Sequence, residues 1–593
     1  MLSEEQLEII SEAITPLFQY LEKEVITDIA RRIAKTLTYS RTAELQAMSM
    51  AKLGYSPARI RKEAMKLLNA DPEYRKAVAK NTLEYKRTIR GIINSITREA
   101  YRANNEIVAG AGNMAWVNDL SVWKSAGKEL KDNSFLQQLV DSFTAQTGGE
   151  LKNMTQTTGF KVMSGYEGIE NAYRRELDKA VIKICSGTFS QEKVIRDVVH
   201  DLAQSGLRSI DFASGYSMQL DTAARLAIRT GCHQLAGKVQ DRNIEQTGEN
   251  LVYVSKHLGA RNTGTGHANH EQWQGRVYFI KEGQDYREEA KRIGQDYITD
   301  LWRATGYSAD GLHENDPTGL YGCNCRHNYY VWFEGASSFP KNHDEKEPAP
   351  ITINGKTYDY YAMTQKMRSM ERNVRALKRE KEAIKSLLEI PGLDTQEIEV
   401  RIRNKTTEYK EFCRKCGVPE QTRRLQYECG TSDLRKTKAW DRYAIQVEGM
   451  KNGWNESNKD LIRIPQIPAS TIIEKIRSGE YSTKLSVQQY DKHCKGTVKY
   501  NEYLQSRRNK GGNPQSIISV SANRAQKIIE TKAGTGIIKV DRLGNPKPQE
   551  QITCDFVVGK YYFRGEYIDT KKCTIHYGKK GSHIVPERGE HYD

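Results

Sequence analysis

The stretch SEEQLEIISEAITPLFQYLEKEVITDIA, residues 3–30, determines how the first part of this chain folds. Its apolar residues recur every three or four positions, as on one face of a helix. They are Leu7, Ile10, Ile14, Leu17, Leu21, Val25 and Ile29. Ser3 and Gln6 have capping-box spacing at the start, and Pro16 predicts a kink. Similar patterns continue, so residues 1–250 are predicted to form a helical region.

Two later segments in this region support that prediction. Asp71 is followed by Pro72 and Glu73, which is the pattern of a helix cap with proline at the first helical position. The segment 221–239 places Ala and Leu on one side, as a packed helix does. Helices built in this way serve packing and assembly, and we expect no enzymatic activity here.

The pattern changes after Gly248. The segments 251–254 and 276–280 are rich in β-branched and aromatic residues, which favours strands. We therefore predict a small α+β unit over residues 251–335. The next stretch, 335–356, is rich in Pro, Ser and charged residues and is predicted to be a linker.

A charged helical hairpin is predicted over residues 357–429. Its first helix carries a heptad-like apolar run that Pro391 and Gly392 end, and a second helix reaches about Cys413. The run consists of Tyr360, Met363, Met367, Met370, Val374, Leu377, Ile384 and Leu388, with Lys381 interrupting it. The Lys, Arg and Glu residues at the other positions are expected to face solvent.

The remainder divides into a linker and a C-terminal domain. Residues 430–482 are mixed in character and contain prolines, which predicts a second linker. Residues 483–593 show short strands and turns, with one helix near 522–532. The expected fold is thus multidomain: mainly α at first, with a small α+β unit and a helical hairpin, then an α+β domain.

Composition limits the possible environments of the protein. No apolar run approaches the ~20 residues of a membrane span, and the first residues, MLSEEQLEII, are acidic where a secretory signal is basic. Ten scattered cysteines fit a reducing cytoplasm.

The net charge is +16, and residues 482–593 hold 20 Lys and Arg against 11 Asp and Glu. That surplus suits either a polyanionic partner or a solubilising surface.

Several phrases in the first 430 residues resemble the phage minor capsid protein 2 family, a branch of the MuF-like minor head proteins. These phrases are SEEQLEII, RTAELQAM, GYSPARIRKEAMKLLNADPEYRKAVAKNTLEYKR, QSGLRSIDFASGYSMQLDTAARLAIRTG, HANHEQWQG and GCNCRH. The resemblance implies a structural protein made in the cytoplasm of a bacterial host. It also implies a location inside the capsid near the portal, with the portal, other capsid proteins and packaged DNA as partners.

Histidines and cysteines gather in two parts of this region, at His257, His267 and His270, and at Cys323, Cys325 and His327. Thiolates and imidazoles are the ligands that zinc prefers. However, C-x-C is tighter than the usual zinc spacing, and the same residues match the family's phrases as ordinary core or loop positions. We therefore assign no metal and no cofactor from the sequence. Cys413 and Cys416, with Cys429 alone beyond them, are interpreted as incidental.

The C-terminal domain combines QQYDKH (488–493), a Gly-Thr pair (496–497) and TIHYGKKGSHIVP (574–586). The combination resembles bacterial toxin 50, also called polymorphic toxin type 50, over about residues 485–588. The resemblance implies a small α+β fold akin to the barnase/EndoU/RelE group and ribonuclease activity. It also implies a toxin carried by a delivery vehicle, here the virion, and a cognate immunity protein.

The residues themselves fit RNA cleavage without a metal. Such cleavage needs a base for the 2′-OH, an acid for the leaving oxygen and a cation beside the phosphate. His576 and His583 flank a Gly-Lys-Lys-Gly turn typical of a hairpin, and are the acid and base candidates in either order. His493 is a third candidate, and Lys492 is the cation.

Supporting roles are assigned to four neighbours. Lys579 and Lys580 would attract the RNA backbone, while Tyr577 and Ser582 would contact the substrate. Among the acidic residues of the tail, Asp541, Asp555, Glu566 and Asp569 are dispersed among strands and turns rather than clustered to hold magnesium. Cys494, Cys554 and Cys573 are expected to pack in the interior, and His591 to have no role.

Two other functions fit the same residues. The basic tail could bind packaged DNA without sequence preference, in a protein that is purely structural. Alternatively, the toxin domain could act by binding a host protein. A single histidine is more often a surface or packing residue than a catalyst.

Overall fold

The computed structural model divides the chain into two compact units, Met1–Arg463 and Ile464–Asp593. It describes every residue except 163–164, 211–215, 263, 282–286, 324, 342, 453–469, 510–511, 541–545, 564 and 588–593. Asp541 and His591 therefore lie outside the described residues. The second unit begins before residue 483, because Ile472 and Ile476 of α15 (Ser470–Arg477) pack into its core.

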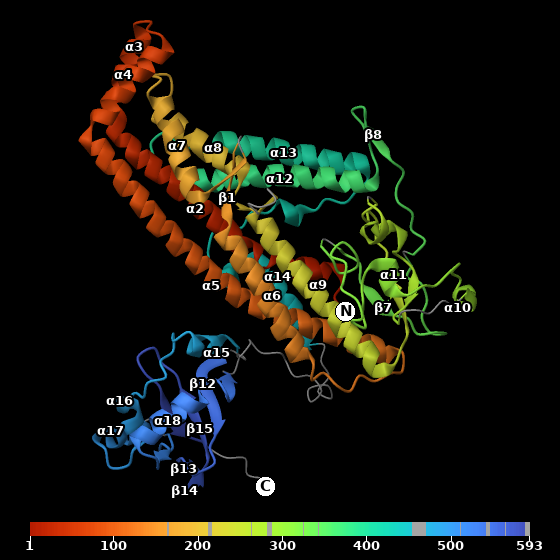
Figure 1. The fold of residues 1–593 in the computed structure, drawn as a ribbon. Helices are drawn as coiled ribbons and strands as arrows, with labels where there is room; N and C mark the ends of the chain where they lie inside the picture. Colours follow the sequence, from red (N-terminus) through yellow and green to blue (C-terminus); the bar gives the residue numbers. More distant parts are fainter. Residues whose placement is uncertain are drawn as a thin grey trace. The chain divides into compact units, whose positions relative to one another are not determined.

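Long helices dominate the first unit (Figure 1). The α-helices described in this unit, short ones included, are α1 (Glu4–Glu12), α2 (Thr15–Leu37), α3 (Arg41–Lys52), α4 (Pro57–Ala70), α5 (Pro72–Ser125), α6 (Leu136–Gln156), α7 (Ile169–Ile184), α8 (Gln191–Ser205), α9 (Leu220–Thr247), α10 (Arg287–Arg292), α11 (Leu301–Thr305), α12 (Tyr360–Lys385), α13 (Gln396–Cys416) and α14 (Lys438–Asn452). The helix expected over 221–239 is α9. Helix α5 packs against α2, α6 and α9 along its 54 residues.

The predicted apolar stripe from Leu7 to Ile29 is confirmed, since all seven of its side chains are fully buried. The capping box also forms: the Ser3 hydroxyl accepts from the Gln6 amide at 3.1 Å, and the Gln6 side chain accepts from the Ser3 amide at 2.9 Å. Pro16 behaves differently from the prediction, because it stands in the first turn of α2. Proline is tolerated there since the first-turn N–H has no helical partner, so Pro16 marks a boundary between two helices and not a kink within one.

A small sheet interrupts the helical region and was missed by the sequence analysis. It has the strand order β2-β1-β3-β4 and is antiparallel throughout. Its strands are β1 (Thr158–Val162), β2 (Gly165–Gly168), β3 (Arg208–Ile210) and β4 (Ser217–Gln219). These strands are short and rich in Gly, Ser and charge, so no two-residue apolar alternation was available to reveal them.

The strands expected after Gly248 are present. β5 (Leu251–Val254) lies between β6 (Val277–Phe279) and β7 (Tyr329–Val331) in an antiparallel sheet. Val252 and Tyr329 belong to the main core of the unit, however, while Leu251 and Tyr253 join a smaller cluster. The sheet therefore packs one face against the helical region and the other against a small hydrophobic cluster of its own.

The helical hairpin is confirmed as α12 and α13, and its interior contains Met363, Met367, Tyr409 and Phe412. The expectation of an entirely solvated polar face is wrong. Arg379 has no exposed surface and forms an ion pair with Glu22 of α2 at 2.5 Å. Helix α12 packs on α2 and α8 as well as on α13, and this second packing face removes Arg379 from solvent.

Both predicted linkers contain ordered elements. Strands β8 (Ile351–Ile353) and β9 (Lys356–Tyr358) pair at the end of the first. In the second, Trp440 and Tyr443 of α14 lie in the main core, so this part is wrong as a linker. Composition alone does not show that a short amphipathic helix will find a partner elsewhere in the chain.

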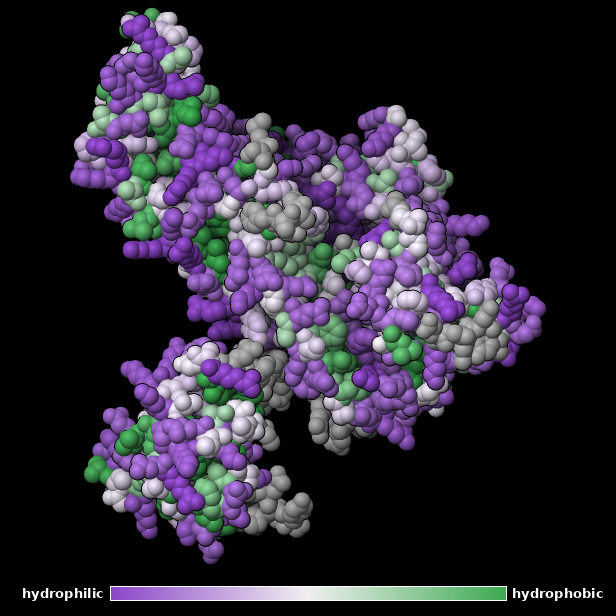
Figure 2. Space-filling model, in the orientation of Figure 1, coloured by the Kyte–Doolittle hydropathy of each residue, from purple (hydrophilic) through white to green (hydrophobic). Residues whose placement is uncertain are grey.

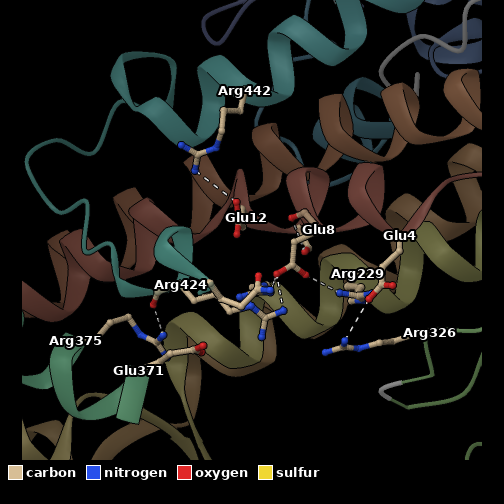
Figure 3. A network of polar contacts seen from close by, with 12 residues as sticks. Glu4, Glu8, Glu12, Arg229, Arg326, Glu371, Arg375, Arg424 and Arg442 are labelled. Atoms are coloured by element: carbon tan, nitrogen blue, oxygen red, sulfur yellow. Dashed lines mark hydrogen bonds and ion pairs between the residues drawn. The ribbon is translucent and has the colours of Figure 1, made fainter. Parts of the chain in front are cut away.

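An ionic network around Glu8 joins three distant parts of the first unit (Figure 3). The Glu8 carboxylate contacts Arg225 at 2.5 Å and Arg229 at 2.8 Å on α9, and Arg424 at 2.7 Å in the turn after α13. These guanidinium groups hold the pKa of Glu8 far below its usual range against the opposing effect of burial. The network thereby ties the beginning of the unit to residues more than 400 positions later.

The second unit is an α+β domain with its own hydrophobic core. Its further elements are α16 (Val487–Tyr490), α17 (Val498–Asn509), α18 (Ala522–Lys532), β10 (Ile517–Ile518), β11 (Ile537–Val540), β12 (Pro546–Thr553), β13 (Gly559–Phe563), β14 (Glu566–Thr570), β15 (Lys572–His576) and β16 (His583–Pro586). One antiparallel sheet has the order β11-β12-β15-β16 and another the order β10-β13-β14. Helix α18 coincides with the predicted helix.

Figure 2 shows that hydrophilic residues predominate on the visible face of each unit, with hydrophobic residues in small separate groups. Among the described residues, no helix combines the length and the apolar character that crossing a membrane requires.

Candidate active site

The candidate site is built on the β15–β16 hairpin of the second unit. The two strands pair in antiparallel register with His576 directly opposite His583. Their rings are nearly parallel, 29° apart, with centroids separated by 4.9 Å. The hairpin inferred from the Gly-Lys-Lys-Gly turn is therefore confirmed, and it brings two histidines together that are seven positions apart in the sequence.

Strand alternation decides which side chains share a face with the two histidines. Ile575 and Ile584 are fully buried in the core, so His576 and His583 project from the opposite face of the sheet. Thr574 lies on that histidine face as well, two residues before His576. The side chains that face the core hold the sheet in place, while the other face remains available for chemistry.

The third histidine comes from a different part of the unit. His493 ends a short 3-10 turn after α16, and its ring lies 6.1 Å from that of His583 with 24° between the planes. Its Nδ1 lies 3.0 Å from the Ser516 carbonyl. A carbonyl only accepts, so Nδ1 carries the proton and Nε2 carries the lone pair. Folding thus brings together two motifs that lie some eighty residues apart in the sequence.

The turn that carries His493 is held by hydrogen bonds. The Tyr490 hydroxyl donates to the Val520 carbonyl at 2.6 Å, and the Thr497 hydroxyl donates to the Asp491 carbonyl at 2.6 Å. Gln515 donates to the Lys492 carbonyl at 3.3 Å. Residues of the QQYDKH motif and of the Gly-Thr pair therefore shape the same turn.

Lys492 lies beside the histidines. Its Nζ donates to Gln489 at 2.8 Å and stands 5.5 Å from the centre of the Tyr503 ring. Its charge also helps to lower the pKa of His493 and of His583. The ammonium group therefore adds positive charge to the surroundings of these two histidines.

The sequence analysis missed a group of polar residues near His576. Glu587 forms an ion pair with Lys539, and its carboxylate accepts from Thr574 at 2.5 Å and from Gln551 at 3.1 Å. Lys539 and Glu587 act on the pKa of His576 in opposite directions. Glu587 directly follows β16, and it lies near His576 because β16 pairs with β15. No local sequence motif indicates this proximity.

Burial lowers the pKa of each of the three imidazoles. The pKa of His493 falls to about 4 and that of His583 to about 3, and in both the neighbouring positive charges add to the effect of burial. The pKa of His576 is lowered by burial and by Lys539, against Glu587. All three rings are therefore neutral at pH 7, as a general base must be. A bound phosphodiester would add negative charge, which favours protonation of one ring.

Two of the predicted substrate contacts are buried. Tyr577 is 6% exposed and its hydroxyl donates to the buried Glu550, while Ser582 is fully buried and donates to the Ser482 carbonyl at 2.5 Å. Tyr577 projects from the core face, as Ile575 does, because strand residues two apart share a face. Neither side chain is placed to contact RNA, and both have a structural role instead. Lys579 and Lys580 lie exposed in the turn, and their contact with RNA remains a prediction.

Tyr577→Phe is expected to reduce stability without changing the chemistry. The substitution removes one hydrogen bond from Glu550, which also accepts from the Gly534 amide at 2.8 Å in a buried setting. The loss should lower the free energy of unfolding by about 1–3 kcal/mol. Thermal unfolding and the cleavage rate of the isolated second unit would measure the two effects. A large loss of rate in a folded variant would contradict this structural role.

The fold and the site together define a multidomain protein, with a mainly helical first unit and a small α+β unit that presents three histidines. The chain belongs to the phage minor capsid protein 2 family, whose match extends over residues 2–414. Residues 485–586 match the bacterial toxin 50 family, so both resemblances are confirmed.

A curated relative supports the first assignment. A structural protein of Lactococcus phage LL-H is 26% identical over 249 residues, which are 42% of this chain and 59% of that protein. The chain thus spans less than two thirds of the length of that relative. No solved structure matches this chain. Membership in a phage structural family indicates a component of the virion.

Proposed function

We propose that this protein is a minor component of the phage head, inside the capsid near the portal, and that its second unit is a ribonuclease toxin that needs no metal. The observation that carries the enzymatic part is the convergence of His493, His576 and His583. They come from two separate motifs, and Lys492 lies beside them. The proposed fold relationship of this unit is to the barnase/EndoU/RelE group.

The proposed reaction is an internal transfer at phosphorus. One neutral imidazole takes the proton of the 2′-OH, whose oxygen attacks the adjacent phosphate. A second, protonated imidazole gives a proton to the departing 5′-oxygen. The products are a 2′,3′-cyclic phosphate and a 5′-OH. Lys492 stabilises the extra negative charge on phosphorus during the transfer. His576 and His583 are the acid and base pair, and His493 is positioned to assist His583.

The direct test is incubation of residues 464–593 with total RNA, in the presence and absence of a chelator. This unit has its own core, so it is suitable for separate expression. Cleavage that resists the chelator and leaves cyclic phosphate ends would support the proposal. Lys492→Ala should be compared with Lys571→Ala, since Lys571 is exposed and outside the site. Equal activity of these two variants would remove Lys492 from the mechanism.

The cleavage rate is expected to rise as the pH falls from about 8 to about 5. Catalysis needs one neutral and one protonated imidazole, and the pKa values of His493 and His583 lie near 4 and 3. Each unit of pH above these values lowers the protonated fraction about tenfold. The measurement is the pH dependence of kcat/KM of the second unit, and a rate that is flat or falls towards acid would contradict it.

The stability of the second unit should fall over the same pH range in which the cleavage rate rises. Histidines with lowered pKa bind fewer protons in the folded state than in the unfolded state, so acid favours unfolding below pH ~6.5. Rates must therefore be taken where circular dichroism shows the unit to be folded.

A second candidate function follows from charge. The basic surplus of the tail suits non-specific binding to packaged DNA, which would weaken steeply as salt is raised. Salt-dependent DNA binding with no cleavage of RNA would favour this alternative. Growth arrest on expression of the tail, relieved by a small acidic protein from a neighbouring reading frame, would favour the toxin and identify its immunity protein.

A further inference from the structure

A buried cluster of histidines and a cysteine lies in the first unit, far in sequence from the toxin. His270, Cys325 and His327 place their ligand atoms within 4.8 Å of one another. His327 has no exposed surface, and the other two are 2% exposed. Two other members of the sequence group lie apart: Cys323 is exposed, and the Nδ1 of His267 lies 2.9 Å from a carboxylate oxygen of Asp316.

Hydrogen bonds outside the cluster decide which imidazole nitrogen faces it. The Nε2 of His270 lies 2.8 Å from the Thr318 carbonyl, so Nε2 carries the proton and Nδ1 carries the lone pair. The Nε2 of His327 lies 3.0 Å from Oε1 of Gln274. That oxygen also accepts from the His257 amide at 3.0 Å, which identifies it as the acceptor end of the side chain. His327 therefore also presents its Nδ1 lone pair.

The spacing of the ligand atoms fits a metal ion. The distance between Cys325 Sγ and His327 Nδ1 is 3.8 Å. Zn–S and Zn–N bonds of about 2.3 and 2.1 Å at a tetrahedral angle would separate these two atoms by about 3.6 Å. The outward hydrogen bonds of His270 and His327 are of the kind that orients imidazole ligands around zinc.

A third imidazole, that of His257, lies next to this group. The ring of His257 stacks on that of His327 with centroids 4.2 Å apart. Its Nδ1 lies 3.1 Å from the Leu258 carbonyl and so carries the proton, which leaves Nε2 with the lone pair. This Nε2 is buried and has no hydrogen-bond partner. His257 also lines two surface cavities, which offers an ion a route to the cluster.

We propose that the first unit binds a zinc ion through His270 Nδ1, Cys325 Sγ and His327 Nδ1, with His257 at the fourth position. Cys325 would bind as the thiolate, so its proton leaves to solvent when the ion enters. The ion would link the loop around His270 to the loop that precedes β7. Such a site is structural, because four protein ligands leave no open position for a substrate.

The test uses the full chain purified without added chelator. Metal analysis should find about one zinc ion per chain. Cys325→Ser and His327→Ala should reduce the zinc content to background. Cys323→Ser is the matched control, since Cys323 lies two residues away and is exposed, and it should retain the ion. Zinc that persists in Cys325→Ser, or that is lost equally in Cys323→Ser, would overturn the proposal.

Cobalt exchange of the wild-type chain provides a readout that does not depend on the folding of the Cys325 and His327 variants. The wild-type chain loaded with Co²⁺ should show a thiolate charge-transfer band and the intense visible bands of tetrahedral coordination. Trp273 should also be quenched, because its ring lies 4.6 Å from His270 and 4.8 Å from His327. Absence of the charge-transfer band would mean that the cluster is held only by a thiol–imidazole hydrogen bond, and would refute the zinc site. His257→Ala should keep the sulfur band but change the visible bands; an unchanged spectrum would remove His257 from the ligand set.

Discussion

Replacing His583 by Ala should lower the rate of RNA cleavage by the second unit by about 10²–10⁴-fold. His576→Ala should have an effect of the same order, because the proposed reaction uses the two side chains, which face each other across the hairpin, as one acid and base pair. The double variant should be little worse than either single variant, since groups that act as a unit lose their contributions together. Gel analysis of a defined RNA, with product ends identified by mass, would measure the effect.

His591→Ala is the matched control for these variants. His591 is the fourth histidine of the tail and lies outside both sequence motifs, so its replacement should leave the rate unchanged. His576 and His583 are partly exposed and project from the face opposite the core, so their loss should not unfold the unit. Full activity in a folded double variant would reject His576 and His583 as the acid and base pair. Salt-dependent DNA binding by a parent unit that does not cleave RNA would instead favour the DNA-binding alternative.

The second large effect concerns stability of the first unit. Arg379→Met should lower its free energy of unfolding by about 3–5 kcal/mol, because burial already raises the pKa of Glu22 and the substitution leaves its carboxyl group in the interior without the compensating guanidinium. Glu22 also accepts from the Leu207 amide at 2.7 Å and from the Tyr427 hydroxyl at 3.0 Å, and Arg379 donates to the Ala203 carbonyl at 2.5 Å. The pair therefore anchors α2, α12 and the segment after α8 at one point.

Two comparisons isolate this ion pair. Arg372→Met replaces an exposed arginine two turns earlier on α12 and should change stability by less than about 0.5 kcal/mol. Replacing both partners, as Glu22→Leu with Arg379→Met, should recover most of the loss, since no unpaired charge remains buried. All seven tryptophans lie before residue 464, so tryptophan fluorescence during denaturation reports on this unit alone. A double variant as unstable as the single one would show that packing, not charge, accounts for the loss.

Local patterns predicted those parts of the structure that depend on neighbours in the chain. The stripe in α1 and α2, the cap at Asp71 and the α18 helix follow from three- and four-residue spacing and from side-chain capping of free amides. The β15–β16 hairpin follows from its Gly-Lys-Lys-Gly turn. The short strands of the β2-β1-β3-β4 sheet have no such pattern, so their pairing with each other could not be predicted.

The candidate site was predicted in part for the same reason. His576 and His583 were paired correctly because the hairpin is local, and the motif resemblance added His493 and Lys492. Tyr577 and Ser582 were misplaced, because their burial depends on Glu550 and on the backbone of Ser482, which lie elsewhere in the chain. Glu587 and Lys539 were missed because they approach His576 only through the pairing of β11, β12, β15 and β16.

The sequence by itself thus determined the two-part organisation, the family memberships, the helical character of the first unit and the histidine hairpin of the second. Each of these features follows from residue spacing or from motifs that can be recognised without knowledge of the fold. Only the tertiary structure decided that Arg379 is buried, that Tyr577 supports the core and that His270 meets Cys325 and His327. These outcomes depend on which distant surfaces pack together, because burial and opposing charges acquire their energetic effect only when packing removes water from both partners.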